Sequence, residues 1–169
     1  DIKIVIGGIR WNSASTLGLL SPPYDENIVF TFHFYDPFLF THQGAQWIKP
    51  LSRLAMLYPG NIRDYRRTVK KLNSYDSEYF TVPEMGRDYL VRRMSPALSM
   101  AKKYDVPVYC GEYGVILSAP ADSAVNWYRD IHSIFEEYGI ARAAWTYKSM
   151  SFGVVNWPGD TAEQIIRCL

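Results

Sequence analysis

The chain has 169 residues, of which 48% are apolar and 21% charged, a composition typical of one globular domain rather than of a disordered segment. Because Lys and Arg number 18 against 17 for Asp and Glu, the net charge of +1 gives no electrostatic case for binding nucleic acid or an anionic membrane surface. No apolar run approaches the roughly 20 residues of a membrane helix, and two cysteines, Cys110 and Cys168, form neither a disulfide framework nor a zinc spacing.

Four apolar runs rich in β-branched residues are predicted to be strands. They cover residues 2–6, 28–32, 106–110 and 141–147. Near-continuous apolar runs of this length are typical of strands buried on both faces, which indicates a parallel sheet covered by helices. Since the chain enters the first run at once and lacks an initial Met, we expect it to be cut from a longer protein, with removal of a secretion signal as the alternative.

Helical patterns alternate with these strands. Apolar spacing and end signals predict helices over residues 62–72, 83–104, 123–138 and 161–169, and a further helix over 46–57 that Pro50 interrupts early. The alternation predicts one α/β domain over residues 1–169 with right-handed crossovers. Four such units make half of an eight-stranded (β/α)8 barrel, and a four-stranded open sheet is the alternative. A nucleotide-binding version of the open sheet is disfavoured, because Gly7-Gly8 belongs to no phosphate-binding glycine motif.

Polar and aromatic side chains follow the predicted strands, where both architectures collect functional residues. They are Trp11, His33, Tyr35, Glu112 and Trp145. Glu112 stands at the end of a buried strand, where burying a charged carboxylate that lacks a partner costs free energy. A structural carboxylate bonded to backbone or to an Arg is the alternative interpretation. Together, a carboxylate, a Tyr hydroxyl, a His and a flat Trp are the groups that cleavage of a glycosidic bond requires.

Four longer stretches extend this pattern from one end of the chain to the other. They read IVIGGIRWN at 4–12, NIVFTFHFYDPFLFTHQGAQW at 27–47, VPVYCGEYG at 106–114, and AWTYK at 144–148 followed by FGV at 152–154. In this order they resemble strands five to eight of glycoside hydrolase family 5, the cellulase family. The resemblance implies the second half of a (β/α)8 barrel, which either a second copy or a missing N-terminal half would complete.

The resemblance also implies roles for single residues. Glu112 would be the nucleophile of a retaining endo-β-1,4-glucanase, and His33 and Tyr35 would line the cleft, with Tyr35 hydrogen-bonded to the nucleophile. Trp145 would be the platform for the sugar, and Trp11 and Lys148 are further candidates for substrate contact. The substrate would be a β-linked polysaccharide, and secretion is implied by the family. Neither a metal nor another cofactor is implied, since the three histidines show no ligand spacing and the retaining mechanism needs none.

The general acid/base of the family is not found in this sequence. That group is a Glu following an Asn, and no Asn-Glu pair occurs; Asp36 is the nearest substitute, and Glu78 and Glu84 lie in the insertion. Because protonation of the leaving group contributes about 10²–10⁴-fold, the chain alone should act poorly on ordinary glucan. The alternatives are a non-catalytic carbohydrate-binding half-barrel and a self-associating barrel fragment.

The two open edges of a half-barrel predict a homodimer. Proteins rarely leave sheet edges bare, and two copies could close one eight-stranded barrel about a twofold axis. The two copies of Glu112 would then lie four strands apart, whereas the two catalytic carboxylates of the family lie three strands apart.

Overall fold

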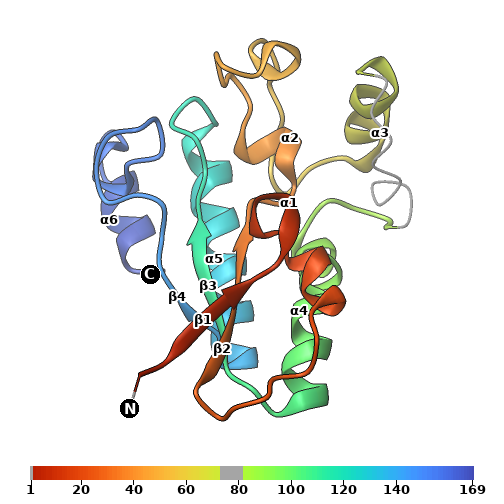
Figure 1. Cartoon of the computed structure of the whole chain (residues 1–169). Helices are drawn as coiled ribbons and strands as arrows, with labels where there is room; N and C mark the ends of the chain where they lie inside the picture. Colours follow the sequence, from red (N-terminus) through yellow and green to blue (C-terminus); the bar gives the residue numbers. More distant parts are fainter. Residues whose placement is uncertain (1, 73–81) are drawn as a thin grey trace.

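A computed structural model describes residues 2–72 and 82–169, and its centre is a four-stranded parallel sheet (Figure 1). The strands are β1 (Ile4–Gly7), β2 (Ile28–Phe34), β3 (Val108–Tyr113) and β4 (Ala141–Arg142). Their order in the sheet, β1-β2-β3-β4, equals their order in the chain. A doubly wound sheet reverses its strand order, whereas a (β/α)8 barrel does not. The predicted α/β arrangement of four consecutive units is therefore confirmed.

The helices lie mainly on one face of the sheet (Figure 1). The α-helices are α1 (Ile9–Asn12), α2 (Phe38–Thr41), α3 (Ile62–Lys71), α4 (Arg87–Tyr104), α5 (Ala121–Tyr138) and α6 (Thr161–Ile166). The 3-10 turns are η1 (Ala14–Leu19), η2 (Lys49–Leu51) and η4 (Val154–Asn156). The predicted end of α5 is confirmed, because Gly139 takes the left-handed conformation that closes the helix. Within the described residues, no helix is both long and apolar enough to cross a membrane.

The helix predicted over residues 46–57 is wrong. Only the short turn η2 forms there, with Pro50 inside it. Proline has no N–H to donate and its ring clashes with the preceding turn, so a helix cannot run across this position. In its described part, the connection between β2 and α4 therefore contains the short α2 and η2, loops, and the amphipathic helix α3, which buries Ile62, Tyr65 and Val69.

The prediction that the strands are buried on both faces is also wrong. Along β2, alternate residues are fully buried and half-buried, with Phe30 and Phe32 in the first set and Thr31 and His33 in the second. The first set lies on the face that the helices cover, since side chains alternate between the two faces of a strand. On the opposite face the side chains of β2 are only half-buried, and this face is the one that carries the candidate site.

The edges of the sheet are its most exposed parts. In β1, Ile4 and Val5 are 44% and 56% exposed. At the other edge, β4 pairs with β3 over two residues only, instead of over the predicted 141–147. Beyond β4 the chain stays beside β3 through single hydrogen bonds, from the Ala143 N–H to the Cys110 carbonyl and from the Trp145 N–H to the Tyr113 carbonyl, each 2.9 Å long.

Candidate active site

A bulge in β3 sets the direction of Glu112. Phe32 of β2 pairs with Cys110, but the next residue, His33, pairs with Glu112, so Gly111 is an extra residue in the ladder. A bulge shifts the alternation of the strand and re-aims the side chain that follows it. Accordingly, Gly111 and Glu112 are both half-buried, between the buried Cys110 and Tyr113. The bulge thus turns Glu112 onto the face that His33 occupies.

Two side chains from β2 and the residue after it contact the Glu112 carboxylate. The Tyr35 hydroxyl donates a hydrogen bond of 3.0 Å to Oε2 of Glu112. Nδ1 of His33 lies 3.4 Å from the same oxygen, and the His33 and Glu112 side chains are 28% and 29% exposed. Among the described residues, no donor is hydrogen-bonded to Oε1. Within the described residues, Tyr35 and His33 therefore contact one carboxylate oxygen, and the other has no hydrogen-bond donor.

Tyr35 is positioned by ring packing and stays protonated. Its ring makes edge contacts with His42 and Phe152, at centroid distances of 5.0 and 5.8 Å. Its carbonyl accepts a hydrogen bond of 2.5 Å from the Thr41 hydroxyl. Burial, together with the charge of Glu112 and the hydrogen bond to it, raises the pKa of Tyr35 well above its ordinary value. The phenol is therefore a neutral hydrogen-bond donor to Glu112 throughout the pH range of a folded protein.

His42 and Phe152 were not predicted as site residues. The His42 ring stacks on Phe38 at 4.2 Å and tilts against Phe152 at 5.2 Å. Burial lowers the pKa of His42 to about 4, so this ring is neutral near pH 7. The signal was present in the sequence, since both residues lie within the stretches that carry the family resemblance. Their role is to support Tyr35 from the side away from Glu112.

Trp145 reaches the site from the segment that follows β4. The Trp145 N–H bonds to the Tyr113 carbonyl, one residue beyond Glu112, and the Trp145–Thr146 peptide bond is cis. Gly114 permits this approach, because a Cβ at that position would lie 2.3 Å from the Trp145 carbonyl oxygen. The Trp145 side chain is half-buried. The structure therefore brings this predicted residue to the end of the strand that carries Glu112.

Trp11 and Lys148 lie on exposed turns at the same end of the sheet. Trp11 is 92% exposed and belongs to a left-handed turn over residues 10–12. The turn is stabilised by Asn12, whose Oδ1 accepts a 2.9 Å hydrogen bond from the Gly8 N–H. Lys148 precedes a second left-handed turn, over residues 149–151. In the described part of the chain, neither residue is hydrogen-bonded or ion-paired with Glu112, so the structure does not draw them into that cluster.

The Asp36 carboxylate, the nearest substitute for an acid, is committed to a different partner. Its Oδ1 lies 3.0 Å from Nε of Arg93 on α4, and each of these side chains is 20% exposed. The Tyr89 hydroxyl donates to the same oxygen at 3.3 Å. Asp36 therefore anchors the loop after β2 to α4. Glu84 is exposed, and Glu78 lies outside the described residues.

The cysteines and histidines show no arrangement for a metal. Across residues 2–72 and 82–169, no three His, Cys, Asp or Glu side chains are grouped to hold an ion. Cys110 and Cys168 are buried free thiols. Burial raises the pKa of Cys110, and its thiol donates a 3.3 Å hydrogen bond to the Glu112 carbonyl. Cys110 thus behaves as a core side chain beneath the site.

Comparison with protein families and curated proteins gives one consistent result. The sequence matches the family model for cellulase, glycosyl hydrolase family 5, over residues 2–151. Endoglucanase C of Acetivibrio thermocellus is 35% identical over 156 residues, which cover 90% of this chain and 46% of that protein. Cellodextrinase A of Ruminococcus flavefaciens is 33% identical over 172 residues, covering 99% of this chain and 45% of that protein. The chain therefore spans about half the length of these relatives.

Solved structures show the same relation. Cel5A of Thermotoga maritima in complex with cellobiose superposes with a TM-score of 0.70 at 25% identity, over 96% of this chain and 47% of that one. CcsZ, a cellulose synthase subunit of Clostridioides difficile, superposes with a TM-score of 0.71 at 25% identity, over 97% of this chain and 49% of its own. The four-stranded unit therefore corresponds to about half of each of these folds.

Proposed function

The chain belongs to glycosyl hydrolase family 5, the cellulase family, and we propose that it carries the nucleophile of a retaining endo-β-1,4-glucanase. The observation that supports this most is the geometry of Glu112, with one oxygen held by Tyr35 and the other without a donor among the described residues. The names of the relatives, an endoglucanase and a cellodextrinase, favour a β-linked glucan as the substrate. Secretion stays a prediction from the family resemblance.

In the proposed reaction, Oε1 of Glu112 attacks the anomeric carbon. A bond forms between this oxygen and the carbon while the glycosidic carbon–oxygen bond breaks, and the departing oxygen takes a proton from a general acid. Water, deprotonated by the conjugate base of that acid, then attacks the same carbon and releases Glu112. Tyr35 donates to Oε2 throughout, which keeps the nucleophile ionised and aimed. His33 would lie beside the reacting sugar, and Trp145 would support the flat face of its ring.

We propose that a complementary half-barrel covers the exposed edges of the sheet and supplies the general acid. The open edge at β1, where Ile4 and Val5 are exposed, supports a missing neighbour, since native sheets rarely leave such edges uncovered. A second copy of the chain is the homodimer that the strand count predicts. An N-terminal half of the family fold is the other candidate. It is supported by the length of the two relatives, of which this chain matches 46% and 45%. The mass in solution distinguishes them, because only the homodimer doubles the mass of the chain alone.

A fluorinated activated substrate tests the nucleophile without requiring the acid. The probe is 2,4-dinitrophenyl 2-deoxy-2-fluoro-β-cellobioside, whose leaving group needs little protonation and whose fluorine slows release of the covalent intermediate. We expect mass spectrometry to find the label on Glu112 in the wild-type chain and no label in Glu112→Gln. The control Glu84→Gln removes an exposed carboxylate and should label as wild type does.

Two outcomes would contradict the proposal. Labelling that persists in Glu112→Gln would assign the nucleophile to another residue. A wild-type chain that binds β-glucan but takes no label would favour the alternative, a non-catalytic carbohydrate-binding half-barrel.

A further inference from the structure

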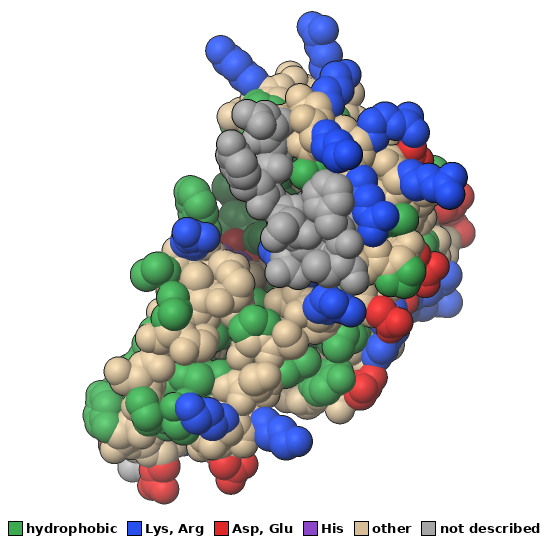
Figure 2. Space-filling view, turned by 90° about the vertical axis from the view of Figure 1, so that its right-hand side faces the viewer, with side chains coloured by type: hydrophobic (Ala, Val, Ile, Leu, Met, Phe, Trp, Pro, Cys, Tyr) green, Lys and Arg blue, Asp and Glu red, His purple; other side chains and the backbone are tan. Residues whose placement is uncertain are grey.

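The insertion between β2 and α4 concentrates positive charge on one part of the molecule. Residues 49–71 contain seven of the 18 Lys and Arg residues and one of the 17 Asp and Glu residues. Figure 1 shows that α3 and the segment after α2 extend beyond the carboxyl ends of the strands, on the side where Glu112 lies. Figure 2 shows Lys and Arg side chains gathered over the upper part of the face that includes α3. A chain with a net charge of +1 thus has a strongly basic region at the same end of the sheet as its candidate active site.

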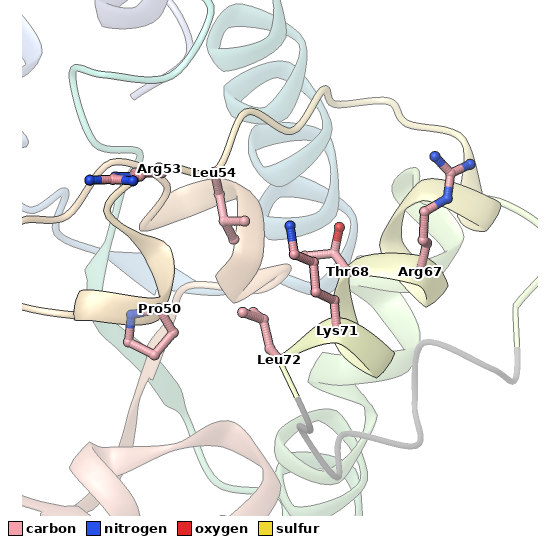
Figure 3. Close-up of a pocket in the computed structure, with 7 residues that line it drawn as sticks. All are labelled: Pro50, Arg53, Leu54, Arg67, Thr68, Lys71 and Leu72. Carbon is pink, nitrogen blue, oxygen red and sulfur yellow. The ribbon is translucent and has the colours of Figure 1, made fainter.

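A cavity of about 280 Å³ opens within this region, between η2 and α3 (Figure 3). We call it the basic pocket, and its cationic lining residues are Arg53, Arg67 and Lys71. Leu54 and Leu72 are among its apolar lining residues. The volume is close to the lower end of small-molecule sites, about 300 Å³. The basic pocket is therefore of a size for one small ring rather than for a large ligand.

The polar groups of the basic pocket lie on two opposite walls. On α3, the Lys71 amine and the Thr68 hydroxyl lie side by side, three residues apart on one face of the helix (Figure 3). Arg53 lies on the wall formed by the η2 segment. Arg67 is paired with Asp64 at 3.2 Å. Within the two described ranges, no carboxylate lies at ion-pair distance from Arg53 or Lys71, so both charges are available to an anion.

We propose that the basic pocket binds a sugar unit that bears a carboxylate. A pyranose presents apolar C–H groups on its ring faces, which match Leu54 and Leu72. A carboxylate on the same ring would accept a charge-assisted hydrogen bond from Lys71, and Arg53 would add positive charge at the edge of the pocket. A free phosphate would pair with the cationic side chains but make no contact with the apolar wall. A neutral sugar would pack against the apolar wall but form no ion pair. The inference rests on the proposed function and specifies it: the preferred β-glucan carries acidic groups.

Two soluble polymers with one backbone test this inference. Carboxymethylcellulose and hydroxyethylcellulose share the β-1,4-glucan chain, and only the first carries carboxylates. Binding is measured by isothermal titration in a Glu112→Gln background, so that turnover does not consume the polymer. We expect tighter binding of carboxymethylcellulose, with the preference fading as salt is raised from about 0.05 to about 0.5 M, because salt screens exposed charges.

A matched pair of variants separates the pocket from surface charge in general. Arg53→Ala with Lys71→Ala removes two charges from the pocket, whereas Lys49→Ala with Lys70→Ala removes two exposed charges from neighbouring positions outside its lining. We expect the first pair to weaken carboxymethylcellulose binding by about tenfold, and the second by less than about twofold. Binding of hydroxyethylcellulose should change in neither variant.

Each of the remaining outcomes leads to one conclusion about the proposal. Equal weakening in both variants, or none in either, would overturn the proposal, and so would a wild-type chain without preference for the acidic polymer. Inorganic phosphate is titrated separately, and phosphate binding that the pocket variant loses, without that preference, would assign the pocket to a free anion instead. Failure to bind hydroxyethylcellulose at all, with the pocket-dependent preference intact, would count against the proposed glucanase function and not against the pocket.

Discussion

Lowering the pH from 7 to 4.5 should destabilise the ring cluster of Tyr35, His42 and Phe152 by placing a charge on His42. Burial lowers the pKa of His42 in the folded chain to about 4, whereas in the unfolded chain it keeps an ordinary value of about 6.5. Between these two values the unfolded chain binds more protons than the folded chain. The free energy of unfolding therefore falls as the pH falls through this window, and His42 contributes no pH dependence above it.

The size of the effect follows from the separation of the two pKa values. At 1.36 kcal/mol for each pKa unit, the full difference corresponds to about 3 kcal/mol, and about 2.5 kcal/mol of it is reached at pH 4.5. Typical domains are stable by about 5–15 kcal/mol, so this loss is a large fraction of the total. Because His42 packs against Tyr35, acid should also release the ring that holds the Glu112 carboxylate.

Urea unfolding of the wild-type chain and of His42→Gln, at pH 7 and at pH 4.5, measures this contribution. Glutamine keeps a polar group near the Thr41 hydroxyl, which lies 3.1 Å from Nδ1 of His42, but it does not titrate. Other groups that titrate in this range add an acid dependence to both proteins, so the contribution of His42 is the difference between their losses. We expect the wild type to lose about 2 kcal/mol more than the variant. Equal losses would refute the argument from burial.

Three further changes have defined outcomes. Gly114→Ala should destabilise the chain by about 1–3 kcal/mol in urea unfolding and weaken β-glucan binding, because the new Cβ would meet the Trp145 carbonyl oxygen at 2.3 Å; Gly18→Ala, with open space around it, is the control and should be near neutral. Asp36→Asn should cost about 2 kcal/mol, since it removes the charge of Asp36 from its largely buried ion pair with Arg93, and an unchanged melting temperature would contradict this. Tyr35→Phe removes the hydrogen bond to Glu112 and should slow labelling by the fluorinated cellobioside by about 10–100-fold while the chain stays folded, as circular dichroism would show.

Local patterns in the sequence identified most of the elements and the chemistry at the strand ends. Apolar β-branched runs located β1, β2 and β3, and Gly139 marked the end of α5, because these signals act over a few residues. The same reasoning failed over residues 46–57, where apolar spacing was outweighed by Pro50. It also predicted sheet burial from apolar runs alone. Burial depends on which neighbouring elements cover each face of the sheet, and the apolar run in β1 does not show which elements these are.

The contacts at the candidate site depended on the tertiary structure. A shift of one residue moves a strand side chain to the other face, so the bulge at Gly111, not the identity of Glu112, decides that the carboxylate faces His33. The Tyr35 hydroxyl meets Glu112 across 77 residues of sequence, and Arg53 and Lys71 line one cavity from separate segments. The sequence by itself determined which chemical groups were present and at the end of which strand each lies. Their distances, burial and partners were decided only when strand register and helix packing brought distant segments together, because no local pattern encodes a long-range contact.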